Sequence, residues 1–234
     1  MKEFGALELL EGVPPVGRAW LEENDLRGLD CGCGKHPTAG WLNVDFRPFG
    51  GPDGRTSAPG RIALLDEAFY FLEHDLREPL PIEDESFAWI YSSHLIEHTR
   101  PPEAIRMLRE MRRLLRPGGL IRVSAPSLRR YIEGYLDPER AFFEEHRRRL
   151  SSIPIFADGV PDRPAWMVNQ VFYLWGHRWI YDVDEIRYVA VEAGFDPSAV
   201  VETGYGESQA AELSAMDPEG RNDVSLYVDI RREA

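Results

Sequence analysis

A short apolar segment that runs into a glycine turn, followed by a second short segment that ends in a carboxylate, constrains the fold of this chain most strongly. The first segment and its turn are residues 28–34, GLDCGCG, and the second is residues 41–45, WLNVD. Glycine lets the backbone approach a ligand closely and take positive φ without a Cβ clash. A carboxylate that closes the next strand is placed to accept hydrogen bonds from ribose hydroxyls. The pair predicts a nucleoside-containing cofactor at the carboxyl end of a parallel sheet.

Composition sets the class of protein around this site. The 234 residues are 43% hydrophobic, which is enough to build the core of a single domain spanning residues 1–234. A net charge of −13 argues against bulk nucleic-acid binding, because phosphate neutralisation needs a basic surface. With no charged-then-apolar leader and no apolar run near 20 residues, we expect no membrane partner and a cytoplasmic location. Cys31 and Cys33 are separated by one residue, so we expect free thiols.

Strand-like and helix-like segments alternate along the chain, which predicts an α/β layered fold. The helix predictions are 102–115, where the apolar residues share one face, and 183–193, which Gly194 follows. The predicted strands are 28–31, 41–45, 69–74, 87–92, 120–125 and 225–231.

Other stretches fit a minimal alternating fold less well. Residues 1–25 are expected to form an N-terminal arm or short helix, and residues 46–66, rich in Pro and Gly, an exposed loop. Only ten residues separate Gly34 from Asp45, so a loop or a single turn is expected there in place of a full helix. Residues 127–181 contain helical patterns and are expected to form an insertion after the fifth predicted strand.

Two longer segments complete a series of four motifs. They are residues 74–98, HDLREPLPIEDESFAWIYSSHLIEH, and residues 110–126, EMRRLLRPGGLIRVSAP. With the two segments above, and in this order, the chain resembles the class I S-adenosylmethionine-dependent methyltransferases, in particular the type 11 group. The resemblance implies a Rossmann-like sheet of seven strands, mostly parallel with the last antiparallel, with helices on both faces. It further implies that residues 127–181 cap the carboxyl ends of the strands.

The resemblance also implies which residues contact S-adenosylmethionine. The first glycine turn would hold the methionine end, and the acid that closes the second strand would bind the ribose hydroxyls. The acid and leucine after the third strand would meet the adenine, and the serines that end the fourth would face the sulfonium. Asp30, Gly32, Cys33 and Gly34 belong to the glycine turn, and Asp45 closes the second strand. Asp75 and Leu76 follow the third strand, and Ser92 and Ser93 end the fourth.

The implied reaction is methyl transfer to a small-molecule acceptor whose accepting atom (O, N, C or S) stays open. A general base is needed only where the acceptor proton must leave, and a histidine suits this role near neutral pH. His177 is the first candidate, because it lies in the aromatic run 172–181, and His94 is the second. That run either anchors the insertion onto the core or forms a lid over the substrate.

Three alternatives compete with this interpretation. His94, Glu97 and His98 form an H-x-x-E-H pattern that resembles a zinc motif, but only a short turn is available to carry it, so no metal site is predicted. A nucleotide-dependent oxidoreductase is disfavoured because Pro37 occupies the place of the third glycine of a dinucleotide fingerprint. A catalytically silent S-adenosylmethionine-binding scaffold or sensor would keep the same cofactor residues without turnover.

Overall fold

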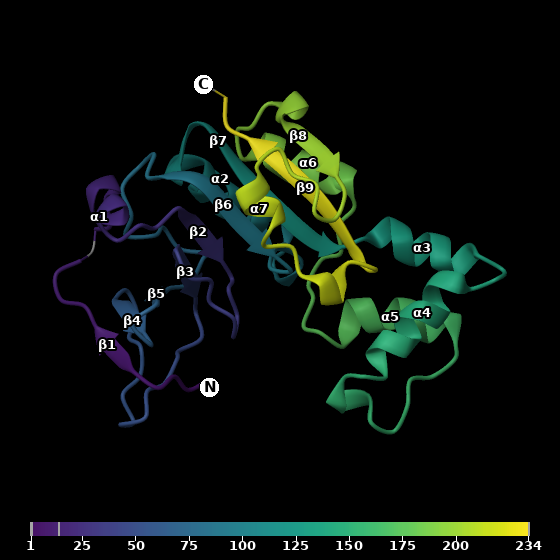
Figure 1. The fold of residues 1–234 in the computed structure, drawn as a ribbon. Coiled ribbons are helices and arrows are strands. Elements are labelled where there is room, and N and C mark those ends of the chain that lie inside the picture. Colours follow the sequence, from purple (N-terminus) through teal and green to yellow (C-terminus); the bar gives the residue numbers. More distant parts are fainter. Residues whose placement is uncertain (1, 14, 234) are drawn as a thin grey trace.

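A twisted sheet forms the centre of the protein, seen here in a computed structural model that describes residues 2–13 and 15–233 (Figure 1). The described strands are β1 (Leu7–Leu9), β2 (Gly28–Cys31), β3 (Trp41–Asp45), β4 (Ile62–Leu65), β5 (Phe69–Glu73), β6 (Phe87–Ser93), β7 (Leu115–Pro126), β8 (Val200–Thr203) and β9 (Ser225–Arg231). Their order across the sheet is β1-β4-β5-β3-β2-β6-β7-β9-β8. The predicted α/β fold is confirmed.

Seven of these strands form the expected sheet. β5, β3, β2, β6 and β7 pair in parallel, and β9 pairs antiparallel with both β7 and β8. β1 and β4 extend the sheet antiparallel beyond β5, which makes nine strands in the described chain where seven were predicted.

The prediction of an exposed loop over residues 46–66 is therefore wrong at its end. Asp66 and Glu67 both have positive φ, at 49° and 56°, which is the backbone of a tight hairpin turn between β4 and β5. The turn brings Ala63 and Leu65 onto Phe71 in an apolar cluster, where all three are fully buried. The Pro and Gly content of residues 46–60 concealed this strand, because a four-residue strand carries little periodicity of its own.

The described helices are more numerous than the two whose bounds were predicted. Both predicted helices are present, over Pro101–Leu114 and Val183–Glu192. In chain order the helices are α1 (Arg18–Glu23), α2 (Pro101–Leu114), α3 (Leu128–Leu136), α4 (Ala141–Leu150), α5 (Pro164–Tyr173), α6 (Val183–Glu192) and α7 (Ala211–Ser214). The 3-10 turns are η1 (Ile96–His98), η2 (Pro154–Phe156), η3 (Pro197–Ala199) and η4 (Glu219–Arg221).

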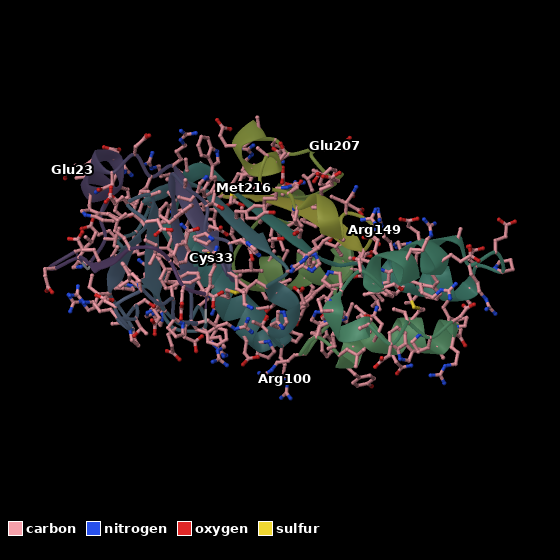
Figure 2. The ribbon with its side chains drawn as sticks, turned by 60° about the horizontal axis from the view of Figure 1, so that its bottom comes forward. Glu23, Cys33, Arg100, Arg149, Glu207 and Met216 are labelled. Carbon is pink, nitrogen blue, oxygen red and sulfur yellow. The ribbon has the colours of Figure 1, made fainter. Side chains whose placement is uncertain are left out.

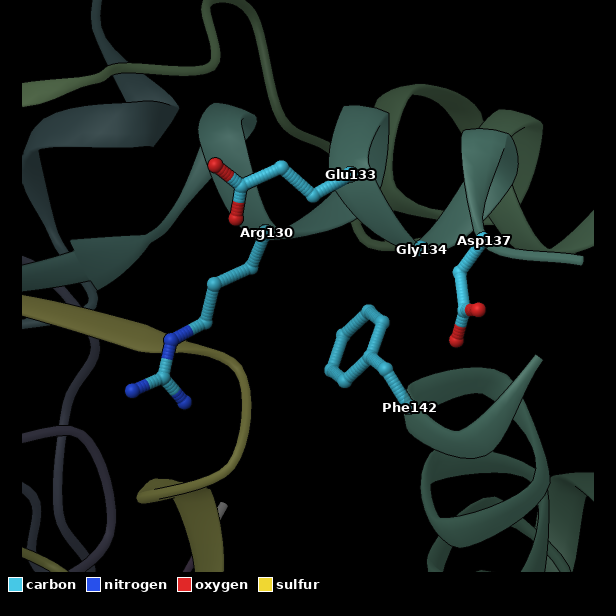
Figure 3. A pocket seen from close by; sticks show the side chains of 5 residues that line it. All are labelled: Arg130, Glu133, Gly134, Asp137 and Phe142. Carbon is cyan, nitrogen blue, oxygen red and sulfur yellow. The ribbon is translucent and has the colours of Figure 1, made fainter. Parts of the chain in front are cut away.

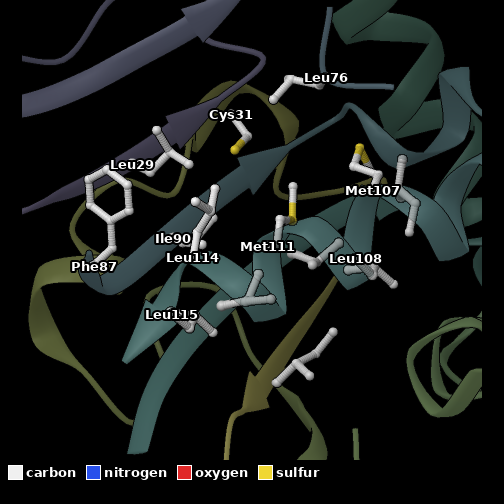
Figure 4. Close-up of a cluster of buried hydrophobic side chains, with 14 of the residues drawn as sticks. Leu29, Cys31, Leu76, Phe87, Ile90, Met107, Leu108, Met111, Leu114 and Leu115 are labelled. Carbon is white, nitrogen blue, oxygen red and sulfur yellow. The ribbon is translucent and has the colours of Figure 1, made fainter. Parts of the chain in front are cut away.

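α2 is held against the sheet by one apolar stripe. Met107, Leu108 and Met111 are buried and face Leu29 and Ile90 of the sheet (Figure 4). The helix starts with two prolines, and the Glu103 carboxylate accepts from the Arg100 backbone N–H at 2.9 Å in a capping box. The helix is thus placed by its own sequence, directly after η1.

The two faces of the sheet are covered unequally. α1, α2 and α6 cover one face and share one apolar cluster with it. The other face carries Trp41, Trp89 and Tyr91 and meets the single-turn helix α7 through Leu213. Residues 32–40 form turns and loop without a helix, as the short Gly34–Asp45 spacing predicts.

Residues 127–181 form a helical region beyond the ends of β6 and β7, which we call the cap. α3, α4 and α5 lie together there (green in Figure 1) around their own apolar cluster, which includes Tyr131, Phe143 and Met167. Ser127 caps α3 by accepting from the Arg130 backbone N–H at 3.3 Å. Among the described residues, no helix combines the length and apolar composition that a membrane crossing needs.

Candidate active site

The carboxyl ends of the parallel strands meet at one edge of the sheet. Cys31 at the end of β2 pairs with Val44 of β3 on one side and Ser92 of β6 on the other. Asp45 at the end of β3 pairs with Glu73 at the end of β5. Parallel pairing in this register brings the loops after β2, β3, β5 and β6 to the same edge, so four motifs that are distant in sequence converge there.

The glycine turn after β2 is tied to the acid that closes β3. Gly32 and Cys33 donate their backbone N–H groups to the Val44 carbonyl at 2.8 and 3.4 Å. Gly34 donates its N–H to Asp45 Oδ2 at 3.0 Å, and the Arg47 N–H donates to Asp45 Oδ1 at 2.9 Å. Asp45 is buried and, among the described residues, hydrogen-bonds only to backbone N–H donors, so each oxygen keeps a lone pair for a further donor.

Gly34 leaves space at this turn. Its φ is +60°, which favours glycine, and no described atom lies within 4 Å of the position that a Cβ would occupy. Gly32 also has positive φ, at +74°, and a Cβ there would meet the Leu95 side chain at 3.0 Å. The turn after β2 is therefore open on the Gly34 side and closed by the loop after β6 on the Gly32 side.

Asp30 lies beneath the turn on the opposite side of β2 from the apolar core. Its carboxylate accepts from the Thr38 hydroxyl at 3.2 Å. Burial raises the pKa of Asp30 to about 7, the Thr38 hydrogen bond opposes this rise, and the neighbouring Asp45 charge adds to it. Burial likewise raises the pKa of the Cys31 and Cys33 thiols, with Asp30 adding to the effect. Both thiols are free and are held in the neutral form.

The residues expected at the adenine lie after β5. The Asp75 carboxylate accepts from Arg77 Nε at 2.9 Å and Nη2 at 2.6 Å in a partly exposed ion pair. The Arg77 hydrogen bond lowers the pKa of Asp75 against the opposing effect of burial, so the carboxylate is ionised. Leu76 is buried and packs in the main apolar cluster. Asp75 thus lies at the predicted edge with an arginine already engaged.

Ser92 and Ser93 end β6 in different environments. Ser92 Oγ is buried and has no hydrogen-bond partner among the described residues. The Ser93 hydroxyl accepts from the Ser124 hydroxyl at 2.9 Å. A buried hydroxyl without a partner costs about 1–3 kcal/mol, so Ser92 Oγ is an unsatisfied polar group at the end of β6.

The two histidines proposed as bases meet at one carboxylate. Glu97, in η1, is fully buried, and its Oε1 lies 3.2 Å from His94 Nδ1 and 3.9 Å from His177 Nε2. His94 has a φ of +50°, which is uncommon outside glycine, and its Nε2 contacts Ser225 Oγ at 2.7 Å. The cap supplies His177 and the sheet supplies His94 and Glu97, so this cluster joins the two regions.

Electrostatics differ between the members of this cluster. Burial lowers the pKa of His177, although the Glu97 charge opposes the shift, so the imidazole is neutral at pH 7. Burial acts to raise the pKa of Glu97, but the neighbouring His94 and His177 outweigh it and the pKa is lowered. Glu97 is therefore an ionised carboxylate in a buried position.

Glu97 is the residue whose central place the sequence pattern missed. Its spacing in H-x-x-E-H is visible in the sequence, but the pattern alone does not show that His177, 80 positions further on, faces it. The link is made by the backbone, because the Arg178 and Trp179 N–H groups donate to the Glu97 carbonyl at 2.7 and 3.2 Å.

Surface hollows lie away from this edge. One is lined by Arg130, Glu133, Gly134, Asp137 and Phe142 and lies between α3 and α4 (Figure 3). Its arginine is engaged with the Asp223 carbonyl at 2.6 Å. In Figure 2, Cys33 lies on the sheet side of the molecule and Arg149 of α4 on the cap side, to which α3 and the hollow also belong. The candidate site is therefore the sheet edge and the histidine cluster, apart from this hollow.

Residues 29–123 match the family model of a methyltransferase domain. A comparison with curated proteins finds no match. Among solved structures, an S-adenosylmethionine-dependent methyltransferase from Mesorhizobium loti is 21% identical, with 92% of this chain and 98% of that chain covered and a TM-score of 0.46. One from Archaeoglobus fulgidus is 13% identical, with 92% and 90% covered and a TM-score of 0.44. Human N-acetylserotonin methyltransferase is 12% identical, with 89% of this chain and 48% of that chain covered and a TM-score of 0.47.

The family match and the strand arrangement together define a class of protein. Residues 29–123 are a methyltransferase domain of the class I type, and the predicted resemblance is confirmed. The cofactor of this domain is S-adenosylmethionine.

The residues at the sheet edge fit this cofactor. Gly34 leaves open space beside the turn, and Ser92 presents a buried hydroxyl that lacks a partner among the described residues. Asp45 has lone pairs free for the two hydroxyls of a ribose. The individual contacts assigned to the nine predicted residues remain predictions.

Proposed function

We propose that the protein transfers a methyl group from S-adenosylmethionine to a small-molecule acceptor bound between the sheet edge and the cap. The observation that carries the proposal is the position of the Glu97 cluster. η1 begins two residues after His94, and Leu95 between them packs against Gly32 of the cofactor turn. An acceptor beside the cluster would therefore lie next to the reactive end of the cofactor.

Each residue of the site has a separate task in this proposal. Asp45 binds the ribose hydroxyls, and Gly34 lets the cofactor approach the backbone. Asp30 offers a negative charge at the methionine end, and Ser92 gains the hydrogen bond that it otherwise lacks. The bound cofactor supplies an activated methyl group on a positively charged sulfur, so the protein contributes mainly alignment of donor and acceptor.

The histidines serve the acceptor in this proposal. His177 is neutral and its Nδ1 contacts the Val171 carbonyl, which leaves Nε2 with a lone pair that can take a proton. His94 is the second candidate base, on the opposite side of Glu97. The net charge of −13 favours a small acceptor over a nucleic acid.

The test is calorimetric titration of the protein with S-adenosylmethionine and S-adenosylhomocysteine, beside NAD as a negative control. Asp45→Ala removes the charged acceptor of two hydroxyl hydrogen bonds, and we expect binding to weaken about a hundredfold. Asp53→Ala, which removes an exposed carboxylate paired with Arg55, is the matched control and should bind as the wild type.

Turnover is measured separately as S-adenosylhomocysteine release with a panel of small hydroxyl, amine and thiol acceptors. Release that depends on one acceptor class supports the proposal. Failure to bind either sulfur compound would overturn it. Binding without release from any acceptor would instead favour the silent scaffold.

A further inference from the structure

Three potential ligand atoms converge where the cap meets the sheet. One ligand atom each from Glu97, His98 and His177 lie within 4.8 Å of one another. The first two residues belong to η1, and the third lies in the turn after α5. The fold therefore brings His177 from the cap to Glu97 and His98, which are two of the three members of the H-x-x-E-H pattern.

The centre of this group is a buried carboxylate that lacks hydrogen bonds. Neither oxygen of Glu97 has a hydrogen-bond partner among the described residues, although the side chain is fully buried. The titratable groups that face it are His94 from the loop after β6 and His177 from the cap. A buried carboxylate is stabilised by cations placed beside it. His94 Nδ1 lies 3.2 Å from Oε1 and can supply one such charge, and a metal ion held by Glu97, His98 and His177 would supply a second.

The two histidines are oriented as metal-bound histidines usually are. The Nδ1 atom of His98 lies 3.2 Å from the Gly176 carbonyl, and Nδ1 of His177 contacts the Val171 carbonyl. A carbonyl only accepts, so each Nδ1 carries the proton and each Nε2 carries a lone pair. Metal-ligating histidines commonly donate their other ring N–H to a backbone carbonyl in this way.

Gly176 has a structural part in this arrangement. Its φ is +77°, and a Cβ added to it would lie 4.0 Å from His98 Nδ1. The left-handed turn directs the Gly176 carbonyl to His98 and places His177 opposite, with the two imidazole rings 5.1 Å apart. One glycine thus positions both histidines.

We propose that Glu97, His98 and His177 bind a divalent first-row transition metal of the Zn²⁺ or Co²⁺ type. Two imidazole nitrogens and one carboxylate oxygen are a common donor set for these ions. Ligands around zinc stand about 3.4 Å apart in a tetrahedron. The 3.9 Å between Glu97 Oε1 and His177 Nε2 is close to this, and the exposed His98 is the member that can move inward.

The burial of the three ligands is graded from inside to outside. Glu97 is buried, His177 is half-buried and His98 is exposed, so the fourth position of the metal faces the solvent side. A site with three protein ligands and one open position is typical of catalytic metals, which polarise an oxygen bound there. This proposal goes beyond the methyl-transfer function. A bound metal and a proton both require Nε2 of His177, so the metal and general-base roles of this residue exclude each other.

The test begins with protein stripped by a chelator and titrated with Co²⁺, followed by its visible absorption and by calorimetry. We expect one ion per chain, at least about tenfold weaker binding in His98→Ala, and the same or a larger loss in His177→Ala. His98 is exposed, so its variant should fold normally. His36→Ala removes an exposed histidine outside the cluster and should bind as the wild type.

Cobalt readouts are independent of methyl transfer. Cobalt binding without turnover would retain the metal site and reject only the methyl-transfer proposal. The metal proposal is overturned if the wild type takes up no Co²⁺ or Zn²⁺, or if His98→Ala and His177→Ala both bind cobalt as tightly as the wild type. A thiolate absorption band, which would place the ion on Cys33, would also overturn it.

Discussion

The sheet and the cap differ in the kinds of polar side chains that they bury. In the sheet, Arg122 of β7 is fully buried and forms ion pairs with Asp217 at 2.6 Å and Asp229 at 2.9 Å. In the cap, the buried cluster centres on a hydroxyl and an amide, with the Tyr131 hydroxyl 3.0 Å from His146 Nε2 and 3.2 Å from Gln170 Nε2, and the Asp223 carboxylate lies 3.2 Å from His146 Nδ1. The buried network of the sheet is therefore fully charged, whereas that of the cap combines a hydroxyl and an amide with a single histidine–carboxylate contact.

The cap and the sheet also differ in how many large apolar side chains they expose. The cap leaves large apolar residues at its surface, among them Leu136 at 72% and Tyr173 at 77% exposed. In the sheet, Leu29, Leu42 and Ile90 are fully buried. Regions with fewer buried apolar contacts open at lower free energy. The difference suits a site in which the sheet holds the cofactor and the cap admits the acceptor.

The largest expected change is a loss of stability when the buried ion pairs of Arg122 in the sheet are broken. Arg122→Ala leaves Asp217 and Asp229 as uncompensated buried charges, and we expect a loss of about 3–5 kcal/mol in the free energy of unfolding. Urea denaturation measures this loss. Arg106→Ala, on the exposed side of α2, is the control and should stay within about 0.5 kcal/mol of the wild type. A loss below about 1 kcal/mol for Arg122→Ala would mean that the ion pairs do not distinguish the sheet from the cap.

The next largest expected change is a loss of stability in the cap. Tyr131→Phe removes the hydroxyl that bridges His146 and Gln170, and we expect a cost of about 1–3 kcal/mol because these buried groups lose a partner. The loss should appear as faster amide hydrogen exchange in α3, α4 and α5 with unchanged exchange in β6 and β7. Tyr135→Phe, at an exposed position of α3, is the control. Equal acceleration in cap and sheet would show that the two regions unfold together.

The smallest effect is a pH dependence at the sheet edge. Asp30 has its pKa raised to about 7 by burial, so it is mostly protonated at pH 6 and mostly ionised at pH 8. A cationic cofactor prefers the ionised form, so its affinity should fall about tenfold from pH 8 to pH 6, equivalent to about 1.4 kcal/mol.

Calorimetry at both pH values measures this difference in cofactor affinity. Asp30→Asn keeps the shape of the side chain without its titration, so its affinity should vary less with pH. The cofactor titrates as well, and the variant isolates the contribution of the protein. An identical pH profile in the wild type and Asp30→Asn would remove Asp30 from the methionine end.

Local sequence predicted the sheet well because short-range physics determines it. The glycine turn, the carboxylate of Asp45 and the prolines and glycines around α2 each act within a few residues, and all four motifs appear where expected. Weakly periodic strands were harder to find. β4 and β8 have four residues each, and β1 has three, so their pairing depends on neighbours distant in the chain.

The sequence by itself determined the α/β class, the order of the motifs and the cofactor edge, because each depends on local turns and on strands that alternate with helices. Only the tertiary structure decided the environment of Glu97. His177 reaches it through the cap, and Asp223 reaches His146 at 3.2 Å from near the end of the chain. Such contacts depend on how separate elements pack, and no spacing within one segment encodes them.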